Sequence, residues 1–272
     1  MDAERVSQDS QGFAKALNRH GYAFQYRTLK TAHDASGSGT HAPGWIFQVA
    51  EFPVEVRGRQ TRIDYLLQWQ NHPTYLVVEC KRANPKLKRW CFAKAPYVVR
   101  GISENHVFAE QVRFDKSTNR LLANTFKEGV HHGKYHLAFE MRVQGERGDE
   151  EGSKGRGDIE DAATQVSLGL NGLIESLRTF ESEFAEGDVM TFLPVIVTTA
   201  TLFVSDVDLT TASLDIGEVD ASTLNLQEQG WVIYQYPVSP GIKHSLPVSR
   251  RSPYFRLFRR ICGCMNGGGI GL

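Results

Sequence analysis

The sequence predicts a mixed α/β domain with a helix on each side of a central β-sheet. Three runs with the composition of β-strands follow one another closely, at residues 45–56, 62–69 and 74–81. Residues 158–180 repeat apolar side chains at alternating steps of three and four, which is typical of an amphipathic helix. Residues 193–204 form a continuous apolar run, as expected of a strand that is buried on both faces.

Weaker patterns predict the remaining elements. The segment SQDSQGFAKALNRHG predicts a short amphipathic helix, with Phe13 and Leu17 on one face and Gly21 at its C-terminal end. The other predicted elements are a loop at 33–44, a helix within 104–128, and strands at 135–143 and 231–236.

Two of these elements carry expectations about side-chain contacts. In the long helix, Asp158 can cap the first turn. Gly169 and Gly172 each cost about 1 kcal/mol there relative to alanine, so they predict close packing of the helix against the sheet. In the alternating strand at 135–143, Phe139 is expected on the apolar face and Glu140 on the opposite, solvated face.

Length and composition favour one globular domain in a reducing compartment. We predict a single domain at 1–245 with a charged, glycine-rich mobile loop near 144–157, followed by a basic C-terminal segment, 246–272, with a flexible glycine-rich tail. The chain begins without a secretory signal pattern and has no apolar run of roughly 20 residues, the length that a membrane span needs. Its four cysteines are too scattered for a disulfide framework. We therefore predict a cytoplasmic protein with free thiols.

The net charge of zero hides a strong asymmetry along the chain. Residues 57–120 contain 13 Lys/Arg against 5 Asp/Glu, whereas residues 148–220 contain 3 against 16. A neutral chain sorted in this way can present one basic face to a polyanion. Solvation by acidic helices on one side, with nothing bound on the other, explains the charges equally well.

Three charged residues interrupt an otherwise apolar pair of predicted strands: Asp64, Glu79 and Lys81. If the turn is centred between Asn71 and His72, Asp64 lies directly across from Glu79, with Cβ atoms about 5 Å apart. Glu79 and Lys81 then share a face, because successive side chains in a strand point to opposite sides. Two carboxylates placed together destabilise the pair unless a cation lies between them, and Lys81 with a divalent ion can supply that charge.

The spacing of these residues is similar to a known motif. Asp64, followed by fourteen residues and then Glu79-Cys80-Lys81, resembles the PD-(D/E)xK superfamily of restriction-endonuclease-like nucleases, with Ile63 standing at the position of the motif's proline. The resemblance implies a restriction-endonuclease-like central mixed β-sheet flanked by helices, with added strands and helices. In that fold the helix at 158–180 and the strand at 193–204 would complete the core.

The resemblance also implies roles for the motif residues. Asp64, Glu79 and the backbone carbonyl of Cys80 would bind Mg²⁺, with Mn²⁺ as a substitute. Lys81 would orient or deprotonate the attacking water and stabilise charge on the phosphate. Hydrolysis of a phosphodiester needs both a hydroxide-like nucleophile and compensation of developing negative charge, and a metal with a lysine supplies both.

A basic and aromatic stretch, KRANPKLKRWCFAKAPYVVR, follows the motif directly. Such a mixture suits a phosphate backbone with exposed bases, although a basic surface helix with core aromatics fits it as well. The nucleic-acid-binding residues predicted here are Lys86, Lys88, Arg89, Trp90 and Lys94. For additional polar residues around the site, the candidates are Glu4, Glu51, Glu55 and Gln165.

Together these features predict a metal-dependent nuclease that hydrolyses phosphodiester bonds in DNA, in restriction, phage defence or repair. The alternative is a non-catalytic module on a degenerate nuclease fold that binds nucleic acid or a protein. The sequence leaves open a homodimer, and dependence on a partner such as an ATPase, because the chain contains no P-loop of its own.

Overall fold

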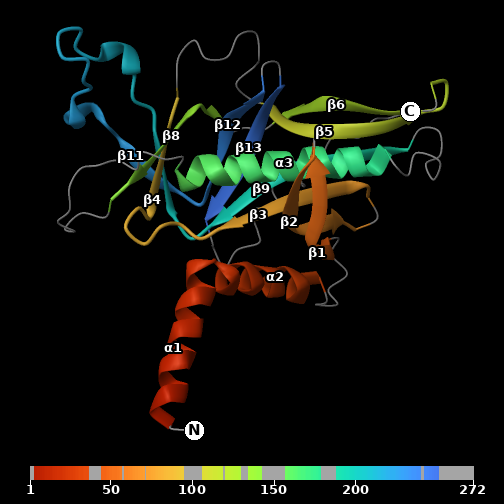
Figure 1. The fold of residues 1–272 in the computed structure, drawn as a ribbon. Helices are drawn as coiled ribbons and strands as arrows, with labels where there is room; N and C mark the ends of the chain where they lie inside the picture. The colour runs from red at the N-terminus through yellow and green to blue at the C-terminus, as the bar shows by residue number, and fades with distance from the viewer. Residues whose placement is uncertain are drawn as a thin grey trace.

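The computed structural model describes residues 3–36, 44–56, 58–70, 72–94, 106–118, 120–129, 134–142, 157–178, 188–239 and 242–250. In these ranges the chain forms a nine-stranded mixed sheet, a four-stranded sheet and three α-helices (Figure 1). The mixed α/β class predicted from the sequence is therefore confirmed. No helix in these ranges combines the length and apolar character needed to cross a membrane.

The elements have the following bounds. The α-helices are α1 (Ala3–Arg19), α2 (Tyr22–Ser36) and α3 (Asp158–Arg178). The large sheet contains β1 (Trp45–Val56), β2 (Arg59–Trp69), β3 (Thr74–Lys81), β5 (His106–Asp115), β6 (Arg120–Gly129), β7 (Lys134–Tyr135), β9 (Val189–Thr198), β12 (Trp231–Ser239) and β13 (Ile242–Arg250). The small sheet contains β4 (Arg89–Ala93), β8 (Leu137–Met141), β10 (Thr201–Ser205) and β11 (Leu226–Gln229).

Strand β9 lies at the centre of the large sheet. It runs parallel to β3 along the whole of that strand, and on its other side it pairs first with β5, antiparallel, and then with β13, parallel. β1, β2 and β3 form an antiparallel meander at one edge. All of β9 from Thr191 to Thr198 is buried, as the apolar run at 193–204 predicts, although a turn at 199–200 divides that run into β9 and β10.

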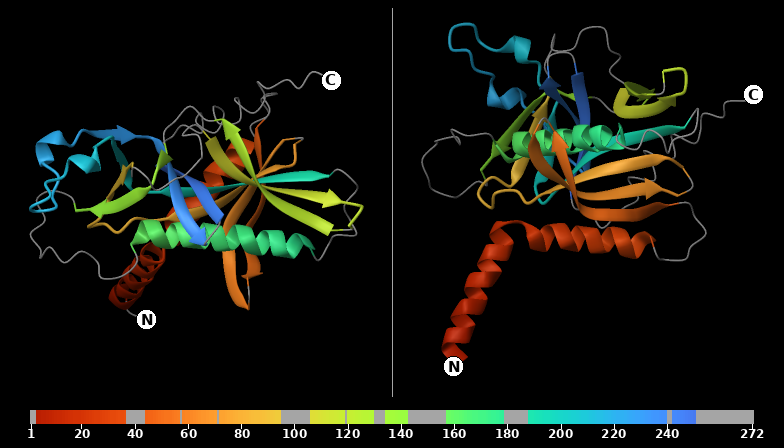
Figure 2. Two further views of the ribbon diagram at one scale, coloured as in Figure 1. Left: turned by 90° about the horizontal axis from the view of Figure 1, so that it is seen from above. Right: turned by 45° about the vertical axis from the view of Figure 1, so that its right-hand side comes forward.

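Helices cover both faces of the large sheet, as predicted (Figures 1 and 2). α3 packs through Val166 and Leu170 into a core that includes Val77 of β3 and Ile196 of β9. α2 packs on the opposite face, where Phe24 joins a second core. Members of that core from the sheet include Tyr65, Leu67, Leu76, Val78, Leu193 and Val195. The large sheet is therefore buried between two apolar layers.

The two glycines of α3 lie against the meander, which confirms the predicted close packing. A Cβ atom added at Gly172 would lie 2.7 Å from the Cβ of Val54, and one at Gly169 would lie 3.0 Å from Cγ1 of Ile63. A side chain at Gly172 would force Val54 or Val56 to shift, and one at Gly169 would require Ile63 to move by a few tenths of an ångström.

We expect Gly172→Ala to lower the melting temperature. Alanine gains about 1 kcal/mol of helix propensity, but overpacking against Val54 and Val56 costs roughly 1–3 kcal/mol. Gly12→Ala in α1 is the matched control, because no atom lies within 4 Å of the added Cβ. Thermal unfolding followed by circular dichroism measures both variants. A Gly172→Ala variant as stable as the control would show that the contact between α3 and β1 relaxes freely.

The N-terminal region departs from the prediction. The first helix begins at Ala3. A second helix, α2, follows it and was not predicted, and its residues 33–36 overlap the loop that was expected at 33–44. Gly21 separates the two with φ of +76°, which agrees with its predicted place at the end of the first helix. Phe13 and Leu17 share a face, but they are 68% and 38% exposed, because α1 projects away from the sheets (Figure 2).

Two further expectations are wrong. Residues 104–128, predicted as a helix, contain the hairpin of β5 and β6, because pairing with β9 stabilises the extended backbone. In β8, Phe139 is 54% exposed and Glu140 is half-buried, the reverse of the predicted faces. Glu140 faces inward because its Oε1 accepts a hydrogen bond from the backbone N–H of Ile159, at 2.9 Å, in the first turn of α3.

The C-terminal boundary predicted at residue 245 falls inside β13, which pairs with β12 and β9. The tail from residue 251 lies outside the described residues, as does nearly all of the loop predicted at 144–157.

Candidate active site

The register of β2 and β3 is the one that the sequence predicts. The paired residues are Tyr65–Val78, Leu66–Val77, Leu67–Leu76 and Gln68–Tyr75. This ladder ends at Tyr65 and Val78, so Asp64 and Glu79 are the next residues on neighbouring antiparallel strands. The two acids therefore meet where the hairpin opens.

Asp64 is held at this opening by two hydrogen bonds. Its Oδ2 accepts the backbone N–H of Cys80 at 2.6 Å, and its Oδ1 accepts a bond from Nε2 of Gln25 at 3.1 Å. Gln25 belongs to α2 and is only 8% exposed. The carboxylate is thus fixed between the end of β3 and the helix that covers this face.

Glu51 supplies a third carboxylate from β1. The pairs Ala50–Tyr65 and Phe52–Ile63 flank it, so it stands across from Asp64. Its Oε1 accepts a hydrogen bond from Gln25, and its Oε2 lies 3.1 Å from Nη1 of Arg62. Glu51 has φ of +51°, which is uncommon for a residue with a side chain and is typical of functional sites.

Burial leaves the negative charge of this cluster only partly compensated. Glu79 is 7% exposed, and its pKa is raised well above the usual value, first by burial and then by the charge of Asp64. Lys81 opposes this rise, and Glu51 adds a smaller contribution to it. Burial also raises the pKa of Asp64 to about 6, although the N–H of Cys80 favours its ionised form. Both carboxyl groups therefore hold a proton more tightly than a carboxyl group in water does.

Lys81 is positioned by the N-terminus of α3. Its Nζ lies 3.7 Å from Oδ1 of Asp158, whose other oxygen accepts the backbone N–H of Asn84 at 2.8 Å. The lysine side chain is 21% exposed, so the ion pair is partly shielded from water. The sequence identifies Asp158 only as a helix cap, because nothing in the pattern connects it with Lys81, 77 residues earlier.

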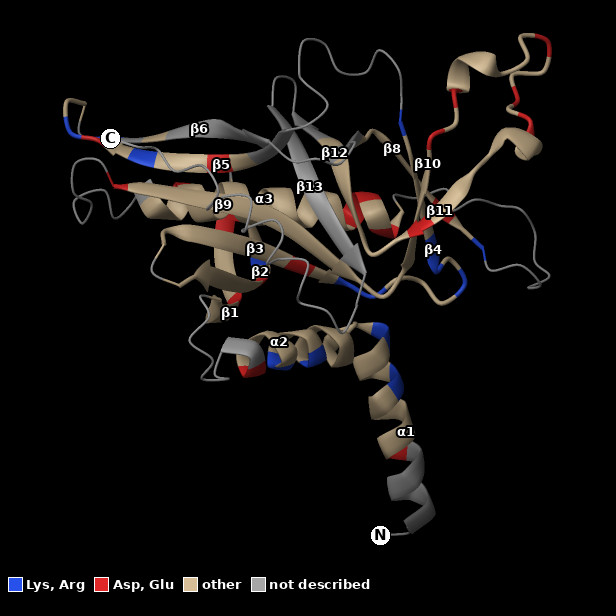
Figure 3. Cartoon of the chain, turned by 180° about the vertical axis from the view of Figure 1, so that it is seen from behind, with Lys and Arg blue, Asp and Glu red and all other residues tan. Residues whose placement is uncertain are grey.

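These groups line one polar cleft of about 500 Å³. β2 and β3 form its floor, the α1–α2 junction borders one side, and α3 contributes Asp158 and Gln165 to the other. Basic residues at its rim are Arg19, His20, Arg62 and Arg82. Figure 3 shows acidic and basic segments next to one another where β2 and β3 approach the α1–α2 junction. The cleft thus has an acidic floor and a basic rim.

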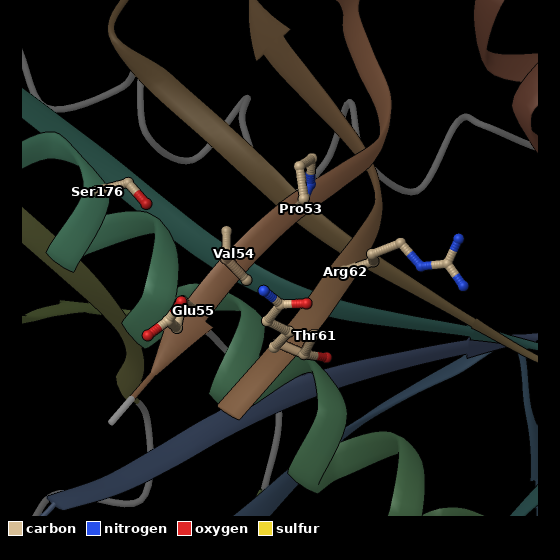
Figure 4. Close-up of a pocket in the computed structure, with 7 residues that line it drawn as sticks. Pro53, Val54, Glu55, Thr61, Arg62 and Ser176 are labelled. Carbon is tan, nitrogen blue, oxygen red and sulfur yellow. The ribbon is translucent and has the colours of Figure 1, made fainter. Parts of the chain in front are cut away.

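The cleft brings together six of the site residues predicted from the sequence: Asp64, Glu79, Cys80, Lys81, Glu51 and Gln165. Glu55 instead lines an adjoining pocket between the β1–β2 hairpin and the C-terminal half of α3, with Pro53, Val54 and Ser176 (Figure 4). The side chain of Glu4 lies outside the described part of the structure. Gln25, which contacts both Glu51 and Asp64, was missed, because α2, the helix that carries it, was not predicted from the sequence.

The predicted nucleic-acid-binding stretch requires a correction. Trp90 has no exposed surface, so its predicted stacking on bases is wrong; β4 carries it into the core beneath α3. The guanidinium of Arg89 lies over the ring of Phe203, at 6.0 Å, and Nζ of Lys94 contacts Oδ1 of Asp206 at 2.9 Å. Lys86 and Lys88 are exposed on the β3–β4 loop, outside the lining of the cleft.

The donor set fits a hard divalent cation that keeps much of its water. Among the described residues, no three Asp, Glu, His or Cys side chains form a group that could hold a metal ion by themselves. Mg²⁺ typically takes only one or two carboxylates from the protein and completes its shell with water and phosphate oxygens. Asp64 and Glu79, with their raised pKa values, are suited to that role because a cation would relieve their repulsion.

No family model, curated protein or solved structure matches this chain. What the cleft can do is therefore inferred from its own residues. Partly compensated carboxylates beside a lysine can bind a cation, and the basic rim can bind phosphate.

The raised pKa of Asp64 predicts the pH dependence of stability. A carboxyl whose pKa is higher in the folded than in the unfolded chain binds its proton more tightly when folded, so it destabilises the metal-free protein as the pH rises from about 4 through about 6. Urea unfolding in EDTA should show this loss in the wild type and a smaller one in Asp64→Asn. Equal pH profiles for the two proteins would contradict the assignment.

Proposed function

We propose that the protein is a nuclease that hydrolyses phosphodiester bonds in DNA with Mg²⁺, or with Mn²⁺ in its place. The observation that carries this proposal is the meeting of Asp64, Glu79 and Lys81 in one cleft, with both acids carrying raised pKa values. Groups whose pKa is shifted by burial and by neighbouring charges, and which lie in a cleft, are typical of catalytic sites.

The order of the elements around the cleft supports the same function. A helix, α2, precedes the meander of β1, β2 and β3, and α3 then leads to β9, which lies parallel to β3. The resemblance to restriction-endonuclease-like nucleases implies that residues 158–180 and 193–204 complete the core, and these segments contain α3 and parts of β9 and β10. The strands between β3 and α3 are divided between the two sheets: β4 and β8 lie in the small sheet, the β5–β6 hairpin pairs with β9, and β7 pairs with β12.

Asp64 and Glu79 would hold the metal, with the carbonyl of Cys80 beside them. When bound, the cation would supply a more acidic water and compensation for charge on the phosphate. The protein contributes the orientation of the ligands: the N–H of Cys80 and the amide of Gln25 hold the carboxylate of Asp64. Glu51, held by Gln25 and Arg62, adds negative charge next to this pair.

Lys81 would orient the attacking water and stabilise charge on the phosphate. Asp158 holds the lysine at the edge of the cleft, on the same strand as Glu79 and two residues beyond it. The guanidinium groups of Arg62 and Arg82 stand at the rim, where they can contact the phosphates on either side of the bond that is cut.

The test is incubation of the protein with linear, circular, single-stranded and double-stranded DNA, with Mg²⁺ or with EDTA. We expect cleavage of at least one substrate with Mg²⁺ and none with EDTA. Binding of DNA without cleavage of any of the substrates, in Mg²⁺ and in Mn²⁺, would reject the nuclease and favour the non-catalytic module.

A further inference from the structure

The turn between α1 and α2 forms one wall of the candidate active site. We name this turn, residues 18–22, the elbow. Nη1 of Arg82 donates a hydrogen bond to the carbonyl of Asn18, and a Cβ atom at Gly21 would lie 3.7 Å from the Cβ of Arg82. The elbow is therefore attached to the residue that directly follows Lys81. Its position relative to the motif is set by the side chain of Arg82, which binds the backbone of the elbow.

The elbow carries an aromatic pair at the rim of the cleft. The ring centroids of His20 and Tyr22 are 6.0 Å apart, with 33° between the ring planes. Both residues line the cleft, and Tyr22 is 39% exposed. These two rings are therefore accessible to a ligand, whereas Trp90 and Phe92 of the basic stretch are buried in the core.

Positive charge accompanies these rings. Arg19 ends α1 and Arg82 follows β3, and both line the cleft. In the described part of the chain neither guanidinium forms an ion pair with an acid, whereas Arg62 pairs with Glu51 and Lys81 with Asp158. Two arginines beside two rings combine a contact for the phosphate backbone with a surface on which a base can stack.

We propose that the elbow binds an unpaired nucleotide of single-stranded DNA, by stacking its base on Tyr22 and His20 while Arg19 and Arg82 contact its phosphates. This inference rests on the proposed function and names its substrate class. In an intact duplex the bases are stacked on one another, so their faces are not free to contact the rings. A single strand, or a frayed end, can offer a base to the elbow and the next phosphate to the cation that Asp64 and Glu79 would hold.

Binding measurements separate stacking from charge. Fluorescence anisotropy in Ca²⁺, which replaces Mg²⁺ to limit cleavage, compares labelled oligo(dT), an abasic oligonucleotide of equal length and charge, and a duplex of equal length. We expect the wild type to bind oligo(dT) about tenfold more tightly than the abasic strand, and more tightly than the duplex. Equal affinity for oligo(dT) and the abasic strand, or tighter binding of the duplex, overturns the proposal.

The matched variants are Tyr22→Ala and Tyr26→Ala. Tyr26 lies one turn further along α2 and is 53% exposed, but it does not line the cleft. Tyr22→Ala should lose the preference for oligo(dT) over the abasic strand, and Tyr26→Ala should keep it. Retention of the preference in Tyr22→Ala would reject the elbow as the stacking surface.

This test is independent of the chemistry. A stacking preference without cleavage of any DNA would reject the nuclease and support the elbow as a binding surface. Cleavage without a stacking preference would support the nuclease and reject the elbow. The wild-type comparison of oligo(dT) with the abasic strand needs no variant, so it remains decisive if a substitution affects folding.

Discussion

The Lys81→Met variant is expected to lose DNA cleavage by about 10²- to 10³-fold while it still binds Mg²⁺. Methionine keeps the aliphatic stem but removes the ammonium group that faces the cleft. Both carboxylates remain, so metal affinity should be preserved. Asp158 also accepts the backbone N–H of Asn84, which should hold the start of α3 in place without the lysine.

Single-turnover cleavage and the Mg²⁺-induced rise in melting temperature measure the two effects on the same protein. Lys116→Met is the control, because Lys116 is an exposed lysine in the turn between β5 and β6 and does not line the cleft. The control should cut at close to the wild-type rate. If Lys81→Met also cuts at the wild-type rate, Lys81 is not part of the catalytic machinery.

The Glu79→Gln variant should be more stable than the wild type without metal and should lose most of the stabilisation by Mg²⁺. Glutamine has nearly the same shape, so it removes the buried charge without leaving a cavity. Because burial raises the pKa of Glu79 well above its usual value, the folded protein loses stability when this carboxyl group ionises, and glutamine avoids that loss. A ligand that binds only the folded protein stabilises it, and removing a metal ligand removes that effect.

Urea unfolding in EDTA and in Mg²⁺ measures both changes. Glu55→Gln is the matched control, since Glu55 is an exposed acid of β1 that does not line the cleft. The control should respond to Mg²⁺ like the wild type. An equal response in Glu79→Gln would mean that Mg²⁺ binds elsewhere.

Local patterns were sufficient to predict the part of the fold that holds the motif. The bounds of β1 and β3, and the register of β2 with β3, follow from apolar runs and from one tight turn. α3 follows from its repeat of apolar residues. In each case the residues that predict the element lie within one short segment. Burial of the sheet on both faces favours the same secondary structure as those residues do locally.

Long-range contacts account for what could not be predicted. Residues 104–128 contain a hairpin because its first strand, β5, pairs with β9, which begins more than 60 residues further along the chain. Gln25, Asp158 and the elbow reach the site from other elements, and none of them lies near the motif in sequence. Trp90 illustrates the reverse error: a basic neighbourhood suggested a binding surface, although the small sheet buries the ring.

The central claim is that Asp64 and Glu79 together bind a divalent cation, and titration with Mn²⁺ followed by electron paramagnetic resonance tests it most directly. The signal of free Mn²⁺ reports how much metal each protein takes up at neutral pH. The wild type and Glu55→Gln should bind Mn²⁺ equally, and the double variant Asp64→Asn/Glu79→Gln should leave the added metal free. Equal uptake of Mn²⁺ by the double variant and the wild type would contradict the claim.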